Sequence, residues 1–393
     1  QNMVRVLTWC LCAAALVNGG HAFSNTLLLS VPTRRHSEAA RKPFGPCLMS
    51  AAIDAMPLVV VAGATGRVGR MVVENLLNPP ANSTQRAVRV RALVRDPKKG
   101  AASLPQNNPA LEILMCDLLS PEELNNACGD AAAAVWCATG FSDSRDASFF
   151  DKLMGAFKLK FTPQESVDIA AMRTMGKSFK DRPSPLGGPS IIMCSSAGVT
   201  RPSWPENKKK RYPGAADIPI VRLNPLGILD VKRQGEEVLR EGGASYVIVR
   251  PCGLNDKWPS GRPVFSQGDV AVGRINRGDV AQLLAAMVFQ PNAAGTTYEA
   301  IALPGYPVPR DFGLQLSRLR RDADITAADA ASQEAVLDAQ YALMQQLVPG
   351  ETMQPNQLAM GQTYEQLDRG EQGRLGPRGQ ELPPIVRSER VVK

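Results

Sequence analysis

Three glycines, Gly63, Gly66 and Gly69, follow one another at a G-x-x-G-x-x-G spacing directly after the apolar run 58–61. Such a corner has no Cβ atoms to block a ligand, and the helix after it turns unpaired N–H groups and its positive dipole end toward an anion. The pyrophosphate of a dinucleotide needs this arrangement. A plain glycine turn in another α/β protein is the alternative, which the strand pattern before the glycines and the helical spacing after them disfavour. We therefore predict cofactor contacts from Gly63, Ala64, Thr65, Gly66, Arg67, Val68 and Gly69.

The end of the next expected strand, 87–94, carries the residues that choose between NAD and NADP. An acidic side chain there binds the adenosine ribose of NAD, whereas an arginine accommodates the extra phosphate of NADP. Arg95 comes first and Asp96 second, so we predict NADP(H) as the cofactor, with Lys98 and Lys99 as auxiliary contacts. An ordinary charged turn is the alternative.

Expected strands alternate with helices along most of the chain and would place these residues at one edge of a sheet. Apolar runs predict strands at 58–61, 87–94, 111–116, 131–137, 190–194, 245–249 and 297–302. The alternation implies right-handed βαβ crossovers, so the predicted fold class is α/β, a doubly wound parallel-sheet Rossmann domain over residues 56–304. The fourth strand ends in Ala138, Thr139 and Gly140, small residues against which the ribose and nicotinamide would lie.

Three segments stand apart from this alternation. The aromatic-rich insertion 141–160 is expected to form a lid or an extra packing element. The C-terminal extension 305–348 contains one strong helical pattern, 326–348, with Val336, Leu337, Tyr341, Met344 and Leu347 on one face. The Gln-, Gly-, Arg- and Pro-rich segment 349–393 is predicted to be a disordered tail. No run of residues is predicted to span a membrane.

Six motifs, in the right order, carry a family resemblance over about residues 56–304: VVVAGATGRVGR, RALVRD, CD, SSAGV, LDVKRQGEEVLREGGASYVIVRPCGL and GRINRGDVAQLL. Together they resemble the atypical short-chain dehydrogenase/reductase group with NAD(P)H-binding domains, and within it the NmrA-like and Tic62-like plastid proteins. The resemblance implies the same fold and a nicotinamide cofactor. It also implies further cofactor contacts at Asp117, Ser195, Lys232, Arg250 and Pro251.

Reductases of this group pair a serine after the fifth strand with Tyr-x-x-x-Lys on the next helix. The lysine ammonium lowers the pKa of the phenol, which supplies a proton as the hydride arrives. The resemblance implies Ser196 (or Ser195) and Lys232 as the catalytic residues, but Ile228 stands where the tyrosine belongs. Lys232 would then hold the nicotinamide ribose or donate a proton itself, or it is an ordinary surface lysine.

Two other tyrosines do not replace the missing one. Tyr212 is followed four residues later by Ala216, and Tyr246 lies in an expected strand, which points its side chain the wrong way. Arg277 and Asp279 are expected to pin the segment that begins at Arg250 to the core. The proton donor is therefore absent from its expected place.

The start of the chain reads as a two-part targeting leader. Met3 is the expected start, and residues 1–22 combine a basic residue, an apolar run and small residues before a cleavage site, as in a signal peptide. Residues 23–50 are nearly free of acids and rich in Ser, Arg and Pro, like a transit peptide. This order resembles the bipartite leaders of plastid proteins in algae with secondary plastids, and a secreted protein is the alternative.

Composition excludes several kinds of chemistry. Both histidines, His21 and His36, fall in the expected leader, which excludes Ser-His-Asp hydrolysis, Cys-His proteolysis and histidine-built metal sites for the mature part. The five later cysteines are odd in number and widely spaced, as in a reducing compartment. The net charge of +8 resides largely outside the core, and the run 208–211 reads as a solvated loop, so no nucleic-acid partner is predicted.

Two functions remain open from the sequence. One is an NADPH-dependent oxidoreductase whose acceptor, a quinone, a flavin or a conjugated carbonyl, takes its proton from water. The other is a nucleotide-dependent regulatory or assembly factor that contacts a thylakoid or assembly partner through 141–160 or the C-terminal helix. The missing tyrosine favours the second, whereas Ser196 and Lys232 favour the first.

Overall fold

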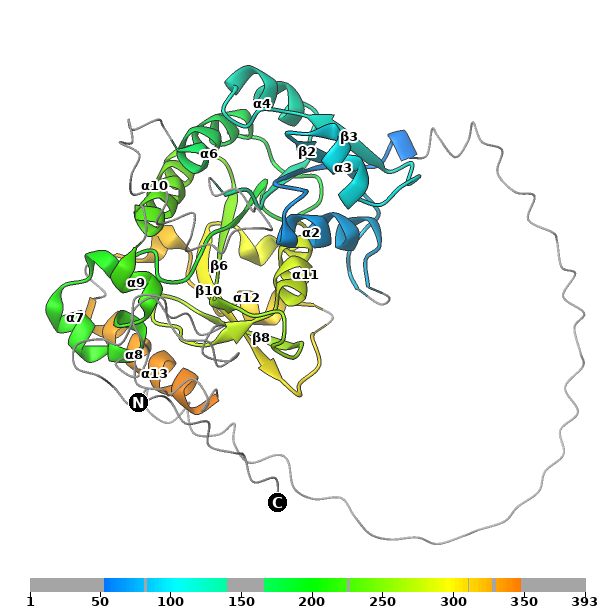
Figure 1. Ribbon diagram of the computed structural model, residues 1–393. Helices are drawn as coiled ribbons and strands as arrows, with labels where there is room; N and C mark the ends of the chain where they lie inside the picture. The colour runs from blue at the N-terminus through cyan, green and yellow to red at the C-terminus, as the bar shows by residue number, and fades with distance from the viewer. Residues whose placement is uncertain are drawn as a thin grey trace, which may run out of the picture. The chain divides into compact units, whose positions relative to one another are not determined.

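An eight-stranded sheet lies at the centre of the described part of the chain (Figure 1). The computed structural model describes residues 53–80, 83–139, 166–224, 227–309, 311–326 and 330–347. The expected leader, Gly140, the insertion 141–160 and the tail 349–393 lie outside these residues. In spatial order the strands are β3 (Leu111–Met115), β2 (Arg89–Val94), β1 (Leu58–Ala62), β4 (Ala133–Trp136), β5 (Ile191–Cys194), β6 (Tyr246–Pro251), β10 (Thr296–Pro304) and β8 (Gly261–Ser266).

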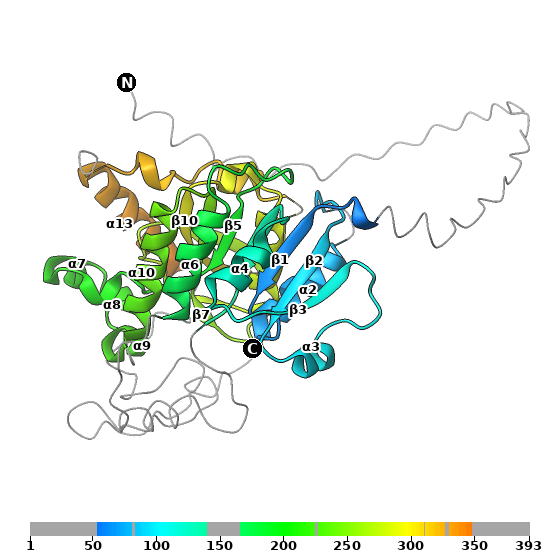
Figure 2. The ribbon, with the colours of Figure 1, turned by 90° about the horizontal axis from the view of Figure 1, so that it is seen from above.

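Helices cover both faces of this sheet (Figure 2). On one face α2 (Arg67–Leu77) packs beside α11 (Arg277–Met287), and on the other α6 (Val167–Ser178) packs between α4 (Pro121–Cys128) and α10 (Ile228–Glu241). Alternate residues of β1 divide between the two layers, since Val59 and Val61 join the α2 and α11 core whereas Val60 joins the α6 and α10 core. Burial on both faces explains why the strands read as continuous apolar runs.

The predicted α/β fold class is confirmed, and one strand corrects the expectation of a purely parallel sheet. Every neighbouring pair from β3 to β10 is parallel, but β8 pairs antiparallel with β10, so that Ser266 lies opposite Glu299. β8 is an edge strand and contains Pro263, which an edge position tolerates because one side of the strand needs no ladder hydrogen bond. Its sequence, GRPVFS, gave no clear alternation.

Short elements connect and extend these layers. They are α3 (Pro97–Ser103), α7 (Glu206–Arg211), α8 (Pro213–Ala216), α9 (Pro219–Leu223), the parallel pair β7 (Gly253–Leu254) and β9 (Arg274–Ile275), α12 (Gly313–Leu316), and single 3-10 turns at Arg201–Ser203, Pro291–Ala293 and Asp322–Asp324. Among the helices that the structure describes, none combines the length and apolar character needed to cross a membrane.

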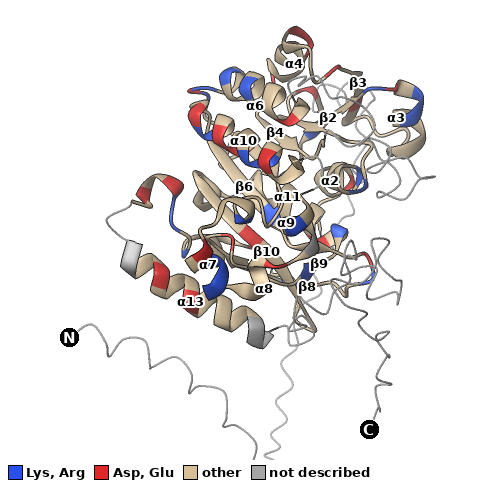
Figure 3. Cartoon of the chain, turned by 60° about the vertical axis from the view of Figure 1, so that its left-hand side comes forward, with Lys and Arg blue, Asp and Glu red and all other residues tan. Residues whose placement is uncertain are grey.

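The C-terminal helix α13 (Ala330–Leu347) lies against α7 and α8 (Figure 3). Asp338 accepts hydrogen bonds from Arg211 Nε at 2.8 Å and from the Tyr212 hydroxyl at 2.9 Å, and the Tyr341 hydroxyl accepts one from the Gly214 amide at 2.9 Å. The rings of Tyr212 and Tyr341 meet edge to face, 5.3 Å between centroids. The basic run 208–211 thus ends in an ion pair with this helix.

Candidate functional site

A tight glycine corner joins β1 to α2. Gly63 has φ +76°, and a Cβ on it would lie 2.6 Å from the Ala138 backbone nitrogen, directly after β4. A Cβ on Gly69 would lie 2.1 Å from the Gly63 carbonyl oxygen, and the Gly66 amide donates to that same oxygen at 2.9 Å. Only glycine fits at Gly63 and Gly69. The corner lies between β1 and β4, where the order of the strands reverses and open α/β sheets bind their ligands.

The side chains around this corner differ in exposure. Ala64 is fully buried and packs in the core, whereas Thr65, Gly66 and Val68 are half-buried and Arg67 is exposed. Arg67, the first residue of α2, has its Nη1 3.9 Å from Asp256 Oδ2. The N-cap residue of α2, Gly66, has no side chain that could cap the helix. The first amides of this helix can therefore receive an anion.

Arg95 and Asp96 lie at the end of β2, on the edge of the sheet that carries the corner. Arg95 is exposed, and Asp96 caps α3 by accepting the Lys98 amide on Oδ1 at 2.9 Å. The acid is thus engaged in the start of a helix, which differs from the charged turn given as the alternative for this segment. Asp96 followed by Pro97 is a helix-start signal that could have revealed α3.

Asp117, Ala138 and Thr139 occupy the ends of β3 and β4. Asp117 is exposed, and its Oδ1 accepts the Leu119 amide at 3.0 Å, which shapes the turn into α4. The Ala138 backbone lies against Gly63. The roles of these residues toward a nucleotide stay predictions.

Glu236 of α10 organises the buried centre beside β5 and β6. Its carboxylate is fully buried and accepts the Ser195 hydroxyl at 2.6 Å, Arg250 Nη2 at 2.6 Å, Arg250 Nε at 2.9 Å and Arg240 Nη2 at 3.1 Å. Burial alone would raise the pKa of Glu236, but Arg250, Arg240 and Ser195 hold it below its ordinary value. The sequence reading assigned no role to Glu236. Ser195 and Arg250 are both bound to it, so their predicted contacts with a cofactor compete with this network.

Lys232 lies one turn before Glu236, and its position fits the lysine of the resemblance. Its Nζ is 3.7 Å from Oδ1 of the buried Asp168, which also accepts the Trp136 indole N–H at 3.3 Å. Residues of α6 and β4 therefore hold the ammonium near the carboxyl ends of β4 and β5. Burial raises the pKa of the nearby Cys194 thiol to about 11, although Lys232 acts in the opposite direction. Lys232 is thus a fixed, largely buried cation rather than a mobile surface lysine.

No tyrosine reaches this region among the described residues. Ile228 packs with Val199, Val221 and Leu229. The Tyr212 hydroxyl bonds Asp338 on α13, and the Tyr246 hydroxyl bonds Asp322 at 3.0 Å near the opposite end of β6. A proton donor in the tyrosine position is therefore missing from the folded site as well as from the motif.

A cavity of about 340 Å³ opens at the carboxyl ends of β5 and β6. Ser195, Ser196 and Pro251, three of the predicted site residues, line it. The other lining residues are Cys194, Ala197, Arg201, Ile218, Ile220, Cys252, Gly253, Leu254, Asn255, Ala271, Val272, Gly273 and Arg274.

Arg277 and Asp279 hold the segment 256–261, as expected. Arg277 Nη1 lies 2.6 Å from Asp256 Oδ1, and Asp279 Oδ2 accepts a hydrogen bond from the Gly261 amide at 3.1 Å.

Glu299 of β10 is a fully buried acid. Its Oε1 lies 3.6 Å from Arg250 Nη1, a long ion pair. Burial, and then the nearby Asp269 carboxylate, raise the pKa of Glu299 to about 8, against the attraction of Arg250 and Arg201. Glu299 therefore stays protonated in the fold at pH values where the unfolded chain is ionised.

We expect Glu299→Gln to stabilise the protein at high pH. Because the folded-state pKa is raised, the parent loses stability as the pH rises from the ordinary carboxyl range toward about 8. The variant should match the parent near pH 5 and exceed it at pH 8.5 by at least about 1 kcal/mol. Urea unfolding at the two pH values measures the difference. A difference that does not change with pH would contradict this assignment.

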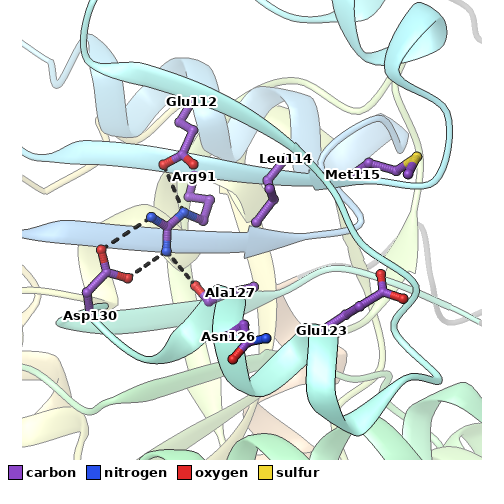
Figure 4. Close-up of a pocket in the computed structure, with 8 residues that line it drawn as sticks. All are labelled: Arg91, Glu112, Leu114, Met115, Glu123, Asn126, Ala127 and Asp130. Carbon is purple, nitrogen blue, oxygen red and sulfur yellow. Dashed lines mark hydrogen bonds and ion pairs between the residues drawn. The ribbon is translucent and has the colours of Figure 1, made fainter.

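A second pocket, of about 500 Å³ at the β3 edge, does not fit a nucleotide (Figure 4). Arg91 is its one basic lining residue, and its guanidinium is fully engaged. Nε donates to Glu112 at 2.8 Å, and Nη1 donates to Asp130 at 2.6 Å and to the Ala127 carbonyl at 2.8 Å. These bonds tie β2 to β3 and to the end of α4. The pocket is thus a surface depression whose lining residues form a structural ion-pair network.

The glycine corner, its place at the reversal of strand order and the mostly parallel sheet define a dinucleotide-binding protein of the Rossmann class. The chain belongs to the NAD(P)H-binding family, whose model matches residues 63–291. The resemblance drawn from the motifs is confirmed at this level. Among the described residues, no group of three or more His, Cys, Asp or Glu side chains forms a metal site.

Similar proteins include chloroplastic ones. An uncharacterized chloroplastic protein of Arabidopsis thaliana is 29% identical over 247 residues, which cover 62% of this chain and 76% of that protein. The chloroplastic protein TIC 62 of Pisum sativum is 27% identical over 248 residues, which cover 60% of this chain and 41% of that protein. The chain thus matches less than half the length of TIC 62.

Solved structures with a similar arrangement include a short-chain dehydrogenase/reductase from Veillonella parvula in complex with NADP. It has a TM-score of 0.44 and 14% identity, and the match covers 64% of this chain and 99% of that one. A Rossmann-fold NAD(P)-binding family protein from Shigella flexneri has a TM-score of 0.40 and 16% identity, with 65% and 98% coverage.

Proposed function

We propose that this chain is an NADP(H)-binding protein of the plastid in which the bound nucleotide regulates association with a partner. One observation carries this proposal: the glycine corner is intact, whereas Ile228 fills the position of the proton donor and no tyrosine lines the cavity among the residues that the structure describes. A protein that binds the nucleotide without completing a reduction needs the first feature and not the second. The chloroplastic relatives and the expected bipartite leader support the plastid assignment.

The predicted cofactor contacts are part of this proposal. Gly63, Gly66, the α2 amides and Ala138 would receive the pyrophosphate, and Arg95 the 2′-phosphate of NADP. Lys232 lies where its ammonium could reach the nicotinamide ribose. The helix α13, which packs on α7 and α8, is the described element through which a thylakoid or assembly partner would act.

A second function has one observation in its favour. The cavity of about 340 Å³ lies beside Cys194 and near Lys232, where the substrate of a reductase would bind. An oxidoreductase at this site would reduce a quinone, a flavin or a conjugated carbonyl that takes its proton from water. Hydride transfer itself belongs to the cofactor.

The two functions separate in one experiment on the full chain. NADPH binding is followed by fluorescence, and NADPH oxidation is then followed with panels of quinones, flavins and aldehydes. Tight binding without oxidation supports the regulatory proposal. Turnover that disappears in Lys232→Ala would overturn it in favour of the enzyme.

Arg95→Ala should weaken NADPH much more than NADH. The loss for NADPH is expected to be about 1–3 kcal/mol, because a charge-assisted contact with the 2′-phosphate is removed. Arg86→Ala is the matched control, since Arg86 is also exposed but precedes the same strand at its other end. Titration of both nucleotides against both variants measures the effect. Equal losses for NADPH and NADH would show that Arg95 does not recognise the phosphate.

A further inference from the structure

Ser195 and Ser196, which we call the serine wall, line the cavity with hydroxyls whose hydrogens are already engaged. The Ser195 hydroxyl lies 2.6 Å from Glu236 Oε1, and the arginines around Glu236 keep it ionised, so this carboxylate only accepts. The Ser196 hydroxyl donates to the Ala197 carbonyl at 3.0 Å. Each serine therefore has only oxygen lone pairs to offer a ligand.

Several other polar groups near the serine wall donate within the protein in the same way. The backbone amides of Ser195, Ala197, Cys252, Gly253 and Asn255 all donate to backbone carbonyls at 2.8–3.1 Å. Arg201 donates from each of its three nitrogens to a carbonyl, those of Asp269, Ala215 and Ala271. These amides and Arg201, as the described part of the chain shows them, are therefore not the converging free donors that stabilise the oxygen of a carbonyl undergoing reduction.

The large apolar side chains of the cavity come from Ile218, Ile220, Leu254 and Val272. No carboxylate stands among its lining residues in the described part of the chain. The apolar body of a small ligand fits such side chains. Asn255 and Arg274 also line the cavity, so a second, accepting group elsewhere on a ligand is compatible with it.

We propose that the serine wall recognises a hydrogen-bond donor, a hydroxyl or an N–H, on an otherwise apolar ligand. This ligand class deepens the proposed function and rests on it, because the ligand is the molecule that the nucleotide-bound protein takes into its cavity. A hydroxyl donates its one hydrogen to Ser195 or to Ser196 without disturbing Glu236. A carbonyl or ether oxygen in the same position faces the oxygen lone pairs of both serines and forms no hydrogen bond with them. The site thus selects hydroxylated molecules over their ketone or ether counterparts.

Two probes of nearly equal shape test this preference. 2-Naphthol carries the donor, and 2-methoxynaphthalene keeps the oxygen but lacks the donor. Binding of each to the full chain is measured by calorimetry with and without saturating NADPH. The naphthol should bind about three- to tenfold more tightly, as one hydrogen bond implies. The preference should shrink in Ser196→Ala and vanish in Ser195→Ala/Ser196→Ala. Ser203→Ala is the matched control, since Ser203 is exposed and outside the cavity.

Each outcome decides the proposal. A naphthol preference that the serine variants remove and the control keeps supports it. Equal affinities, tighter binding of the ether, no binding of either probe, or a preference that survives the double variant would overturn it. NADPH binding, measured separately, reports on the proposed function. A chain that ignores NADPH but shows the serine-dependent preference would overturn that function alone.

Discussion

Gly69→Ala should reduce NADPH affinity by at least about 100-fold, roughly 3 kcal/mol. The added Cβ would lie 2.1 Å from the Gly63 carbonyl oxygen, so the corner must open to accommodate it. Opening moves the backbone at Gly63 and Gly66 that would face the pyrophosphate. Overpacking of this kind also costs stability, about 1–3 kcal/mol. Fluorescence titration with NADPH measures the first effect, and thermal unfolding without nucleotide measures the second.

Gly129→Ala is the control for this substitution. Gly129 follows α4 with φ −57°, and the nearest atom to an added Cβ is 3.5 Å away, so the methyl group fits. This variant should keep both the melting temperature and the affinity of the parent. If Gly69→Ala binds NADPH as tightly as Gly129→Ala does, the glycine corner is not the nucleotide site.

Glu236→Gln should lower the free energy of unfolding by roughly 3 kcal/mol. The amide has nearly the shape of the carboxylate, but it removes the charge that holds Arg250, whose side chain is 7% exposed. It also replaces one accepting oxygen by a donor that faces guanidinium N–H groups. A buried cation left without its partner accounts for most of the loss. Urea unfolding at pH 7.5 measures it.

The neighbouring position supplies the control and the pH dependence. Glu237 is exposed and pairs with Arg233 one turn away, so Glu237→Gln should change stability by less than about 0.5 kcal/mol. Because the folded-state pKa of Glu236 is lowered, its contribution is present above the ordinary carboxyl pKa and is lost as the pH falls through the lowered value. The gap between parent and Glu236→Gln should therefore narrow in acid. A gap that is equal at pH 7.5 and in acid would contradict the ion-pair role.

The parallel strands of the central sheet and the glycine corner could be predicted from the sequence because their causes are local. Strands buried on both faces need continuous apolar runs, and a corner with Gly63 at positive φ needs glycine at that position. Both requirements act over a few neighbouring residues. The position of Lys232 was also predictable, because it lies one helical turn after Ile228 on the same helix, α10.

The Glu236 network and the cavity could not be predicted in this way. Glu236 meets Ser195 across 41 residues, and Arg250 from the next strand completes its charge balance. The spacing of residues within a single helix or strand does not predict a contact between residues this far apart in the sequence. The cavity wall likewise combines residues that follow β5 and β6 with Ile220 of α9 and Val272, and only the fold shows that they converge. Asp96, by contrast, was a missed helix cap whose signal was local.

The family match ends at residue 291, yet β10 begins at Thr296 and lies between β6 and β8. A recombinant fragment cut at the end of the match would therefore leave β6 with a bare row of amide and carbonyl groups on one side. Exposed strand edges recruit other chains, and such a fragment is expected to precipitate. Expression boundaries for biochemical work should extend past Leu347, so that α13 also keeps its contacts with Tyr212 and Gly214.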